Sequence, residues 1–231
     1  IDGATYHAIE FTGATVKAMS LDSRMTLANM VIEMGAKAGL VDMEGLELPY
    51  DYEPITPDEG ATYSKVVTID VSEIEPRVAA PHSPDNVKPI SEFEGTPIQQ
   101  AFIGSCTNGR LEDLHEAAKI LKGKKIDPNV RFLIAPASRK VYVDAVSDGT
   151  AQILMEAGAT FLPSGCGPCV GTHLGVPGNG ENVASSTNRN FQGRMGNPNS
   201  NVYLGSPSFV AAAALKGKIT NPQSILEEEA N

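Results

Sequence analysis

The sequence predicts an α/β protein with a mostly parallel sheet and helices on both faces. After residue 98, short apolar stretches alternate with amphipathic ones, an order typical of βαβ units. Ligands of such sheets bind beyond the carboxyl ends of the strands. The chain has only three cysteines, and all three lie in polar, glycine-containing turns. These observations direct attention to the turns that follow the expected strands.

The C-terminal part of the chain contains the clearest elements. We expect apolar strands at 101–104, 130–136, 160–162 and 202–205, and helices at 111–121, 140–147, 151–157 and 209–215. Cys106 falls in the loop that leaves the first of these strands and enters the first of these helices.

The N-terminal part is expected to contain a strand at 6–11 and a helix at 24–37. Asp22 or Ser23 is a suitable N-cap for that helix, and Gly39 is a suitable stop.

Two polar residues of this expected helix, Asn29 and Glu33, are four residues apart among several methionines. On one α-helix they would share a face. From the residues alone, the pair is either a solvated stripe or part of a site.

The domain organisation follows from shifts in composition. Residues 42–62 are acidic and loop-like, and residues 64–71 alternate in the manner of a strand. Five prolines at 76, 81, 84, 89 and 97 indicate a linker. We therefore predict an α/β unit at 1–80, a proline-rich linker at 81–97 and an α/β domain at 98–231. The chain opens on Ile1, already within strand-like sequence, so we expect residues 1–80 to be a fragment of a domain whose N-terminal part is absent.

Bulk composition excludes several classes of function. Hydrophobic residues make up 41% of the 231 residues, which is ordinary for a globular protein. The formal net charge of −10 and the lack of a basic stripe argue against nucleic-acid binding. No apolar run of about 18 residues and no secretory leader is evident, so we expect no membrane partner. An odd, low cysteine count disfavours a disulfide framework and predicts a cytoplasmic protein.

The three cysteines indicate an inorganic cofactor. Cys106 lies in I-G-S-C-T-N-G, and Cys166 and Cys169 lie in G-C-G-P-C. In such turns backbone amides can point at sulfur, and glycine lets the backbone approach a bulky group. Three thiolates leave one corner of a cubane cluster open for a substrate. A Cys₃His zinc site that includes His173 remains an alternative on spacing alone.

A second polar run points to the kind of substrate. Arg189 and Arg194 lie five residues apart in T-N-R-N-F-Q-G-R. Guanidinium groups bind carboxylates with two parallel hydrogen bonds, whereas a structural zinc site needs no such pair. The run therefore favours a substrate with several carboxylates.

These motifs together carry a resemblance that covers nearly the whole chain. The runs I-G-S-C-T-N-G-R, S-G-C-G-P-C-V-G and S-T-N-R-N-F-Q-G-R-M-G resemble the aconitase superfamily. Residues 25–39 resemble the large subunits of 3-isopropylmalate dehydratases and homoaconitases, with a form after Ser138 most similar to the shorter, archaeal-type subunits. The resemblance implies aconitase-like three-layer α/β/α domains.

The resemblance also implies site residues. It makes the three cysteines ligands of a [4Fe–4S] cluster whose fourth iron is left for the hydroxyl and a carboxylate of the substrate. Arg189 and Arg194 match substrate-binding arginines. Asn29 and Asn188 match asparagines close to the cluster, and Glu33 matches a glutamate that contacts the iron-bound hydroxyl or water.

The implied reaction is a hydro-lyase isomerisation of 2-isopropylmalate and 3-isopropylmalate by dehydration and rehydration, in leucine biosynthesis. Homoaconitase, or another 2-alkylmalate or citramalate isomerase, is the nearest alternative. A structural zinc module or an electron-transfer iron–sulfur module is an alternative of another class. Apo-form RNA binding is disfavoured by the excess of acidic residues.

The base of the family reaction is a serine of a swivelling domain, which in the dehydratases belongs to a separate small subunit. The chain offers no counterpart of that serine, and its four histidines, His7, His82, His115 and His173, match no catalytic motif of the family. We therefore expect a heterodimer with the small subunit, and an isolated chain that is not a complete catalyst.

Overall fold

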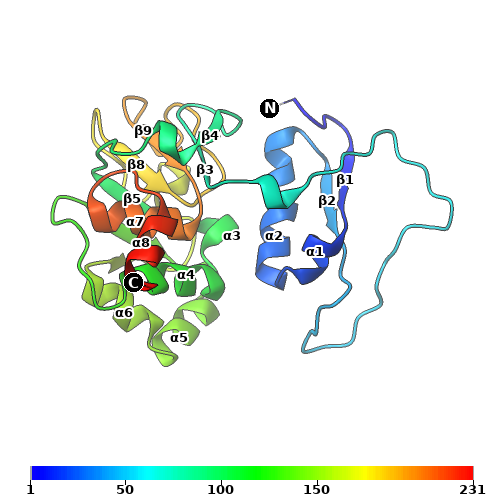
Figure 1. Cartoon of the computed structure of the whole chain (residues 1–231), viewed down its shortest axis with the longest axis horizontal. Coiled ribbons are helices and arrows are strands. Elements are labelled where there is room, and N and C mark those ends of the chain that lie inside the picture. The colour runs from blue at the N-terminus through cyan, green and yellow to red at the C-terminus, as the bar shows by residue number, and fades with distance from the viewer. Residues whose placement is uncertain (1, 231) are drawn as a thin grey trace. The chain divides into compact units, whose positions relative to one another are not determined.

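The computed structural model describes residues 2–230 and divides them into two compact units (Figure 1). The N-terminal unit comprises residues 2–75 and the C-terminal unit begins at Pro76. No helix among the described residues is long and apolar enough to cross a membrane.

The N-terminal unit is a small βαβ arrangement. Strands β1 (Ala8–Phe11) and β2 (Ala38–Val41) pair in parallel, and the chain between them forms α1 (Ala14–Ala18), α2 (Leu21–Met30) and the 3₁₀ turn η1 (Val31–Met34). Helix α2 packs on β2. Glycine is required at Gly39, because a Cβ atom there would lie 2.9 Å from Val31 and 3.0 Å from Ala28.

The helix expected at 24–37 is shorter and differently capped. Ser20 is its N-cap, since its hydroxyl accepts a hydrogen bond of 3.0 Å from the Ser23 amide. The α-helix ends at Met30, and η1 ends at Gly35, whose φ of 77° is the left-handed conformation that glycine adopts readily. Gly39, the expected stop, lies within β2 instead.

A buried arginine holds this unit together. Arg24 is only 2% exposed. Its guanidinium donates to the carbonyl oxygens of Met19 (3.1 Å), Lys17 and Glu44 (both 2.9 Å), and also to that of Asp42. The charge is buried at low cost because its donors are shared among four backbone acceptors from two segments, residues 17–19 and 42–44.

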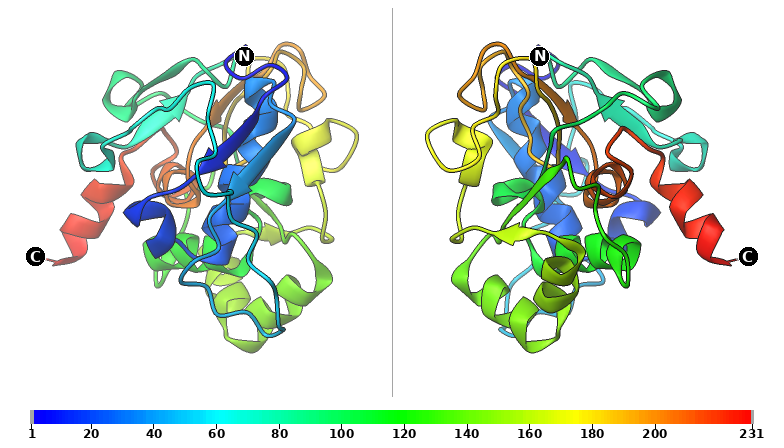
Figure 2. Two further views of the ribbon diagram at one scale, coloured as in Figure 1. Left: turned by 90° about the vertical axis from the view of Figure 1, so that its right-hand side faces the viewer. Right: turned by 90° about the vertical axis from the view of Figure 1, so that its left-hand side faces the viewer.

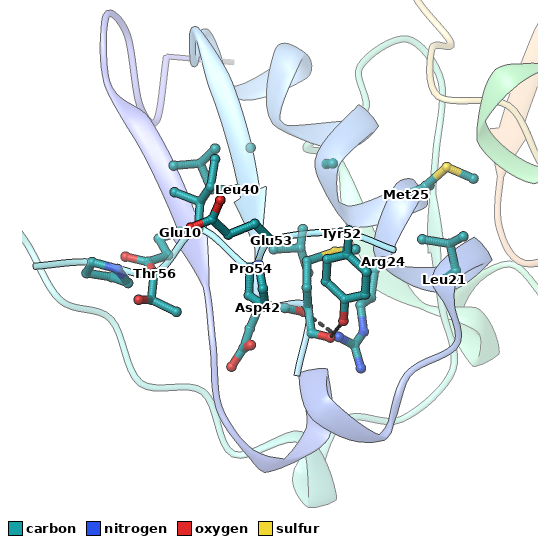
Figure 3. Close-up of a pocket in the computed structure, with 16 residues that line it drawn as sticks. Glu10, Leu21, Arg24, Met25, Leu40, Asp42, Tyr52, Glu53, Pro54 and Thr56 are labelled. Atoms are coloured by element: carbon teal, nitrogen blue, oxygen red, sulfur yellow. Dashed lines mark hydrogen bonds between the residues drawn. The ribbon is translucent and has the colours of Figure 1, made fainter. Parts of the chain in front are cut away.

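A pocket of about 660 Å³ adjoins this arginine within the N-terminal unit (Figure 3). Its walls come from α2, β2 and the segment 52–57, and they are mainly apolar, with Glu10, Asp42 and Glu53 at the margin. Tyr52 lies beside Arg24, and its hydroxyl donates to the carbonyl oxygens of Met43 and Leu46, at 3.3 Å in each case.

The strand expected at 64–71 is not formed. Residues 42–70 contain no helix or strand, and Val66, Val67 and Ile69 are 66–78% exposed. An alternating sequence becomes a strand only beside a partner strand, and none pairs with it in the described part of the chain.

The C-terminal unit is built on a seven-stranded sheet in the order β4-β3-β9-β8-β5-β6-β7. The five strands from β9 to β7 are parallel, and β3 and β4 are antiparallel at one edge. The strands are β3 (Arg77–Ala79), β4 (Val87–Pro89), β5 (Gln100–Gly104), β6 (Arg131–Ala135), β7 (Thr160–Phe161), β8 (Asn182–Ser185) and β9 (Asn201–Leu204). The expected α/β class with a mostly parallel sheet is confirmed.

Five helices cover one face of this sheet. They are α4 (Leu111–Leu121), α5 (Arg139–Ser147), α6 (Thr150–Ala157), α7 (Pro207–Lys216) and α8 (Pro222–Ala230), while α3 (Ser105–Asn108) and the 3₁₀ turns η2 (Val71–Glu73), η3 (Ile90–Glu92) and η4 (Gly167–Val170) are short. Residues of all five pack with Ala101 and Ile103 of β5 in one core.

Among the described residues of this unit, those packed on the opposite face of the sheet come mainly from loops and the short turn η4. Phe102, fully buried, points to this face with Val183 and Val202, and they pack against Cys169 and Met195 from loops. Figure 2 shows the loop that contains η4 on the side of the sheet away from α7 and α8. The segments that pack on this face include Cys169, one of the three cysteines.

The segment expected to be a linker is part of the C-terminal unit. Residues 81–97 contain β4 and η3, and β4 pairs with β3 so that Pro89 lies opposite Arg77. Ile90 is 4% exposed. Proline is tolerated on an edge strand because no further strand needs its missing amide donor. Residues 77–89 thus form an antiparallel hairpin at the edge of the sheet and not a linker. The N-terminal unit ends at Glu75.

Asp148 provides a test of how the helical layer is stabilised. Its Oδ1 accepts a hydrogen bond of 2.9 Å from the Thr150 amide at the start of α6, and its Oδ2 lies 2.7 Å from His115 Nε2 on α4. The hydrogen bond with His115, followed by those with Thr150, lowers the pKa of Asp148 from 3.8 to about 2.

We predict that Asp148→Ala lowers the free energy of unfolding by about 0.5–1 kcal/mol at neutral pH, the usual cost of losing a helix-terminal acceptor. Because the folded-state pKa is depressed, this contribution is present above pH 3.8 and is lost as the pH falls towards 2. Urea unfolding of parent and variant across this range checks the prediction. Asp144→Ala, which removes an i,i+4 pair with Lys140, is the control and should cost less than about 0.5 kcal/mol at neutral pH.

Candidate functional site

The predicted site residues of the C-terminal unit follow three strands of one parallel sheet. Cys106 comes after β5, Cys166 and Cys169 after β7, and the run that contains Arg189 and Arg194 after β8. The chain passes from β5 outward to β6 and β7, then returns to the other side of β5 to form β8. The strand order reverses between β5 and β8, which is where open α/β sheets bind ligands.

The turn that contains Cys106 is tight and strained. A Cβ atom at Gly104 would lie 2.7 Å from both the Ala135 carbonyl oxygen and the Phe102 ring, so only glycine fits there. Ser105 has a φ of 74°, a left-handed conformation that costs a residue with a side chain about 1–3 kcal/mol. The next residue, Cys106, is exposed. The strained turn therefore leaves the Cys106 thiol exposed just beyond the carboxyl end of β5.

The second cysteine segment is held against the sheet. Gly167 has a φ of 51°, and a Cβ atom there would lie 2.9 Å from the Phe102 ring. The Cys169 amide donates to the Cys166 carbonyl oxygen at 3.1 Å. Cys169 is 4% exposed, whereas Cys166 is exposed. The 3₁₀ turn η4 thus buries one thiol and leaves the other open.

The three thiols and Arg194 lie close enough to affect one another. Burial raises the pKa of the Cys169 thiol, and the negative charges of Cys106 and Cys166 raise it further. The Arg194 guanidinium forms a hydrogen bond with the Cys169 sulfur and lowers that pKa in part. The Nε–H of Arg194 is buried and has no hydrogen-bond partner among the described residues.

The donor set fits a cluster better than a single ion. Within residues 2–230, no three His, Cys, Asp or Glu side chains are grouped closely enough to hold one metal ion. A cubane cluster is larger than one ion and holds its cysteines further apart. Two thiols near enough to Cys169 to affect its pKa, a cationic side chain at Cys169 and glycines where a Cβ atom would collide are consistent with such a group.

Two glycines lock the cysteine loop to the arginine loop. A Cβ atom at Gly171 would lie 2.4 Å from the Gly196 nitrogen and 2.9 Å from the Arg194 carbonyl oxygen. A Cβ atom at Gly196 would lie 2.6 Å from the Gly171 carbonyl oxygen. The two backbones therefore pack directly on each other, which fixes Arg194 relative to Cys169.

A polar network joins the ends of β5 and β8. Asn108 Nδ2 donates to the Ser186 carbonyl oxygen at 2.8 Å, and the Ser186 amide donates to that of Phe102 at 3.0 Å. The Ser186 hydroxyl accepts from the Gly104 amide at 3.3 Å. Asn108 and Ser186 were not singled out from the sequence, although both lie within the motifs that carry the resemblance.

Asn190 anchors the loop between Asn188 and Arg194. It is fully buried, and its Nδ2 donates to the carbonyl oxygens of Ala80 (2.8 Å), Val202 (3.1 Å) and Ala79 (3.3 Å). Asn188, 6% exposed, and the half-buried Arg189 precede this anchor. The signal for this loop in the sequence was the dense polar run at residues 187–194.

Asn29 and Glu33 belong to the N-terminal unit, where they do not lie on one continuous α-helix. Asn29 is in the last turn of α2, and Glu33, 7% exposed, is in η1. The change from α-helix to 3₁₀ turn between them alters the expected spacing, because a 3₁₀ helix aligns residues three apart. The roles of this pair near the cysteines stay predictions.

Comparison with known proteins assigns the family. The model of the aconitase family (aconitate hydratase) matches residues 1–52 and 89–217. The chain belongs to the aconitase family. It is 50% identical over 232 residues to the 3-isopropylmalate dehydratase large subunit 1 of Methanopyrus kandleri, covering 97% of this chain and 56% of that protein. It is also 50% identical over 237 residues to the methanogen homoaconitase large subunit of Methanocaldococcus jannaschii, covering 95% of this chain and 56% of that protein.

The chain therefore spans little more than half the length of the curated relatives that it matches. Among solved structures, that of Thermococcus kodakaraensis aconitase X (holo-form) matches with a TM-score of 0.39 at 16% identity, over 81% of this chain and 49% of that chain. A likeness this weak adds nothing to the assignment.

We predict that Gly171→Ala is far more damaging than Gly180→Ala. Both glycines have a φ of +75°, but nothing lies within 4 Å of a Cβ atom at Gly180. The control should lose about 1–2 kcal/mol of unfolding free energy from the backbone conformation alone. Gly171→Ala should lose a further 1–3 kcal/mol, roughly the cost of overpacking. Urea unfolding measures both, and equal losses would show that the two loops do not need this close approach.

Proposed function

We propose that this chain is the cluster-bearing part of a large subunit of a [4Fe–4S] hydro-lyase that isomerises 2-isopropylmalate and 3-isopropylmalate. Membership of the aconitase family and the names of the relatives support the reaction class. The observation that carries the proposal is the grouping of three thiols and the Arg194 guanidinium where the strand order reverses. Dehydration followed by rehydration needs an electrophile, carboxylate binding and a positioned base.

In this proposal Cys106, Cys166 and Cys169 hold the cluster. When bound, the cluster supplies a Lewis acid that assists the departure of hydroxide. The exposed Cys106 and Cys166 leave the outer side of the site accessible, while the buried Cys169 anchors it to the sheet.

Arg189 and Arg194 are proposed to bind the carboxylates of the substrate. A guanidinium has five N–H donors. One side of Arg194 is engaged at the Cys169 sulfur, and its buried Nε–H lacks a partner among the described residues, so donor capacity remains for an anion. Fixing Arg194 in advance by the packing of Gly171 on Gly196 lowers the entropy lost when substrate binds.

The remaining roles follow from the family resemblance. Asn188 and Asn29 are proposed to donate hydrogen bonds close to the cluster. Glu33 is proposed to hold the proton that accompanies the leaving and returning hydroxyl group. The Glu33 side chain is 7% exposed.

A small subunit is proposed to complete the site with the base that removes the proton next to a carboxylate. The relatives are named large subunits, which implies such a partner. Homoaconitase is the second candidate activity, because one relative with this name is as similar as the dehydratase. Citramalate-type isomerases would use the same arrangement. A zinc module and an electron-transfer cluster are the competing classes of function. Anaerobic reconstitution with iron and sulfide separates both from the hydro-lyase.

Anaerobic reconstitution with iron and sulfide tests the cofactor. We expect about four irons and four acid-labile sulfides per chain, one of the irons being readily lost on oxidation. Serine in place of Cys106, Cys166 or Cys169 should abolish this uptake, whereas His173→Ala should not. Uptake of zinc alone, with loss of zinc in the His173 variant, would establish the zinc module instead.

Turnover tests the reaction and the substrate. A full-length large subunit that contains this sequence should isomerise 2-isopropylmalate only with a small subunit present, and homocitrate-type substrates are compared in the same assay. Arg189→Lys should lower kcat/KM by about 10- to 100-fold, because lysine keeps the charge but not the paired hydrogen bonds. Turnover without the small subunit, or an unaffected lysine variant, would contradict this division of roles.

A further inference from the structure

We propose that Arg110 is a positioning residue for the cluster: its guanidinium locks the strained turn at residues 105–108 and so holds Cys106 in place. The inference rests on the proposed function in that Cys106 is taken as a cluster ligand. The contacts of Arg110 themselves do not depend on that assignment.

The guanidinium of Arg110 reaches back over α3. Its Nη1 donates to the Thr107 carbonyl oxygen at 2.6 Å, and its Nη2 donates to the Cys106 carbonyl oxygen at 2.8 Å. Carbonyl groups at the end of a helix lack partners within the helix. One planar fork therefore joins two consecutive carbonyl groups of the turn, one of them belonging to the cysteine itself.

Arg110 is in turn fixed by a longer helix. It is the N-cap residue of α4, and its amide donates to Asp113 Oδ2 at 2.9 Å. Asp113 is 8% exposed and lies in the first turn of α4, whose residues Leu114, Ala117 and Leu121 are buried in the core. The side chain thus ties a four-residue turn to the first turn of the neighbouring helix, where Asp113 and Leu114 are buried.

The turn has reason to need such a tie. Ser105 adopts a left-handed backbone conformation. This conformation is unfavourable for a residue with a side chain, and it persists only where the surrounding structure stabilises it. Helix α3 has only four residues, too few for its own hydrogen bonds to stabilise it. Cys106 is exposed, whereas its neighbours Ser105 and Thr107 are each 1% exposed. Two charge-assisted hydrogen bonds act at this weak point.

Two variants separate geometry from charge. Arg110→Lys keeps the positive charge but cannot join two carbonyl groups with a planar fork, and Arg110→Gln loses both. If the fork matters, both variants lose iron from the reconstituted cluster at least about tenfold faster than the parent, the change expected for one charge-assisted hydrogen bond. Iron loss is followed by the electron paramagnetic resonance signal of the three-iron form. Lys119→Gln, on the same helix in an exposed pair with Glu116, is the matched control.

A second measurement needs no cluster. Hydrogen exchange of the apo-protein should be about tenfold faster at the amides of residues 106–109 in both variants, with exchange in α4 unchanged. This arm distinguishes the two proposals, since a parent chain that takes up no cluster refutes the proposed function while the exchange result still tests Arg110. A lysine variant that behaves like the parent, or exchange that rises equally throughout α4, would overturn the positioning role.

Discussion

The parallel pairing of β5 with β8 is the constraint on which the site depends. Gln100 lies opposite Val183, although more than half of the C-terminal unit separates them in the sequence. Because both strands end at the same edge, the turn after Gly104 and the run after Ser185 are delivered to one place. The cysteines after β7 reach that place by folding back over the sheet, where Cys169 packs against Phe102. Without this register, three motifs of suitable chemistry would remain scattered.

Precision at that edge comes from close approach and from satisfied polar groups. Gly171 and Gly196 allow two loops to touch through their backbones, and Asn190 ties one of these loops to three carbonyl groups of the sheet. Such contacts fix atoms better than exposed ion pairs, which contribute only about 0.2–1 kcal/mol each. The N-terminal unit has a similar contact, in which the Arg24 guanidinium donates to four carbonyl groups from two separate segments. Rigid placement of donors before ligand binding is what a carboxylate-binding site requires.

Much of the fold could be predicted where the pattern was local. The helix expected at 111–121 is α4 with the same bounds, because its apolar spacing and polar first turn specify it without distant partners. The strand expected at 64–71 and the linker expected at 81–97 depended on what lies beside them. Strand β8, four residues long within glycine-rich sequence, was missed because its stability comes from pairing with β5 and β9 and not from its own composition. The shortened α2 ends at Met30, and the 3₁₀ turn η1 that follows it ends where Gly35 adopts a positive φ, an end that the sequence pattern did not single out.

The sequence by itself determined the chemistry available to this protein: three thiols in glycine-rich turns, paired guanidinium groups and membership of the aconitase family. Residue type and local spacing carry that information, since they do not depend on distant contacts. The tertiary structure alone decided which groups meet. It brought Arg194 to Cys169, and it brought the Asn190 side chain to the carbonyl groups of Ala79 and Ala80. Such contacts arise from strand register and loop packing, and these are properties of the whole folded unit that no local pattern encodes.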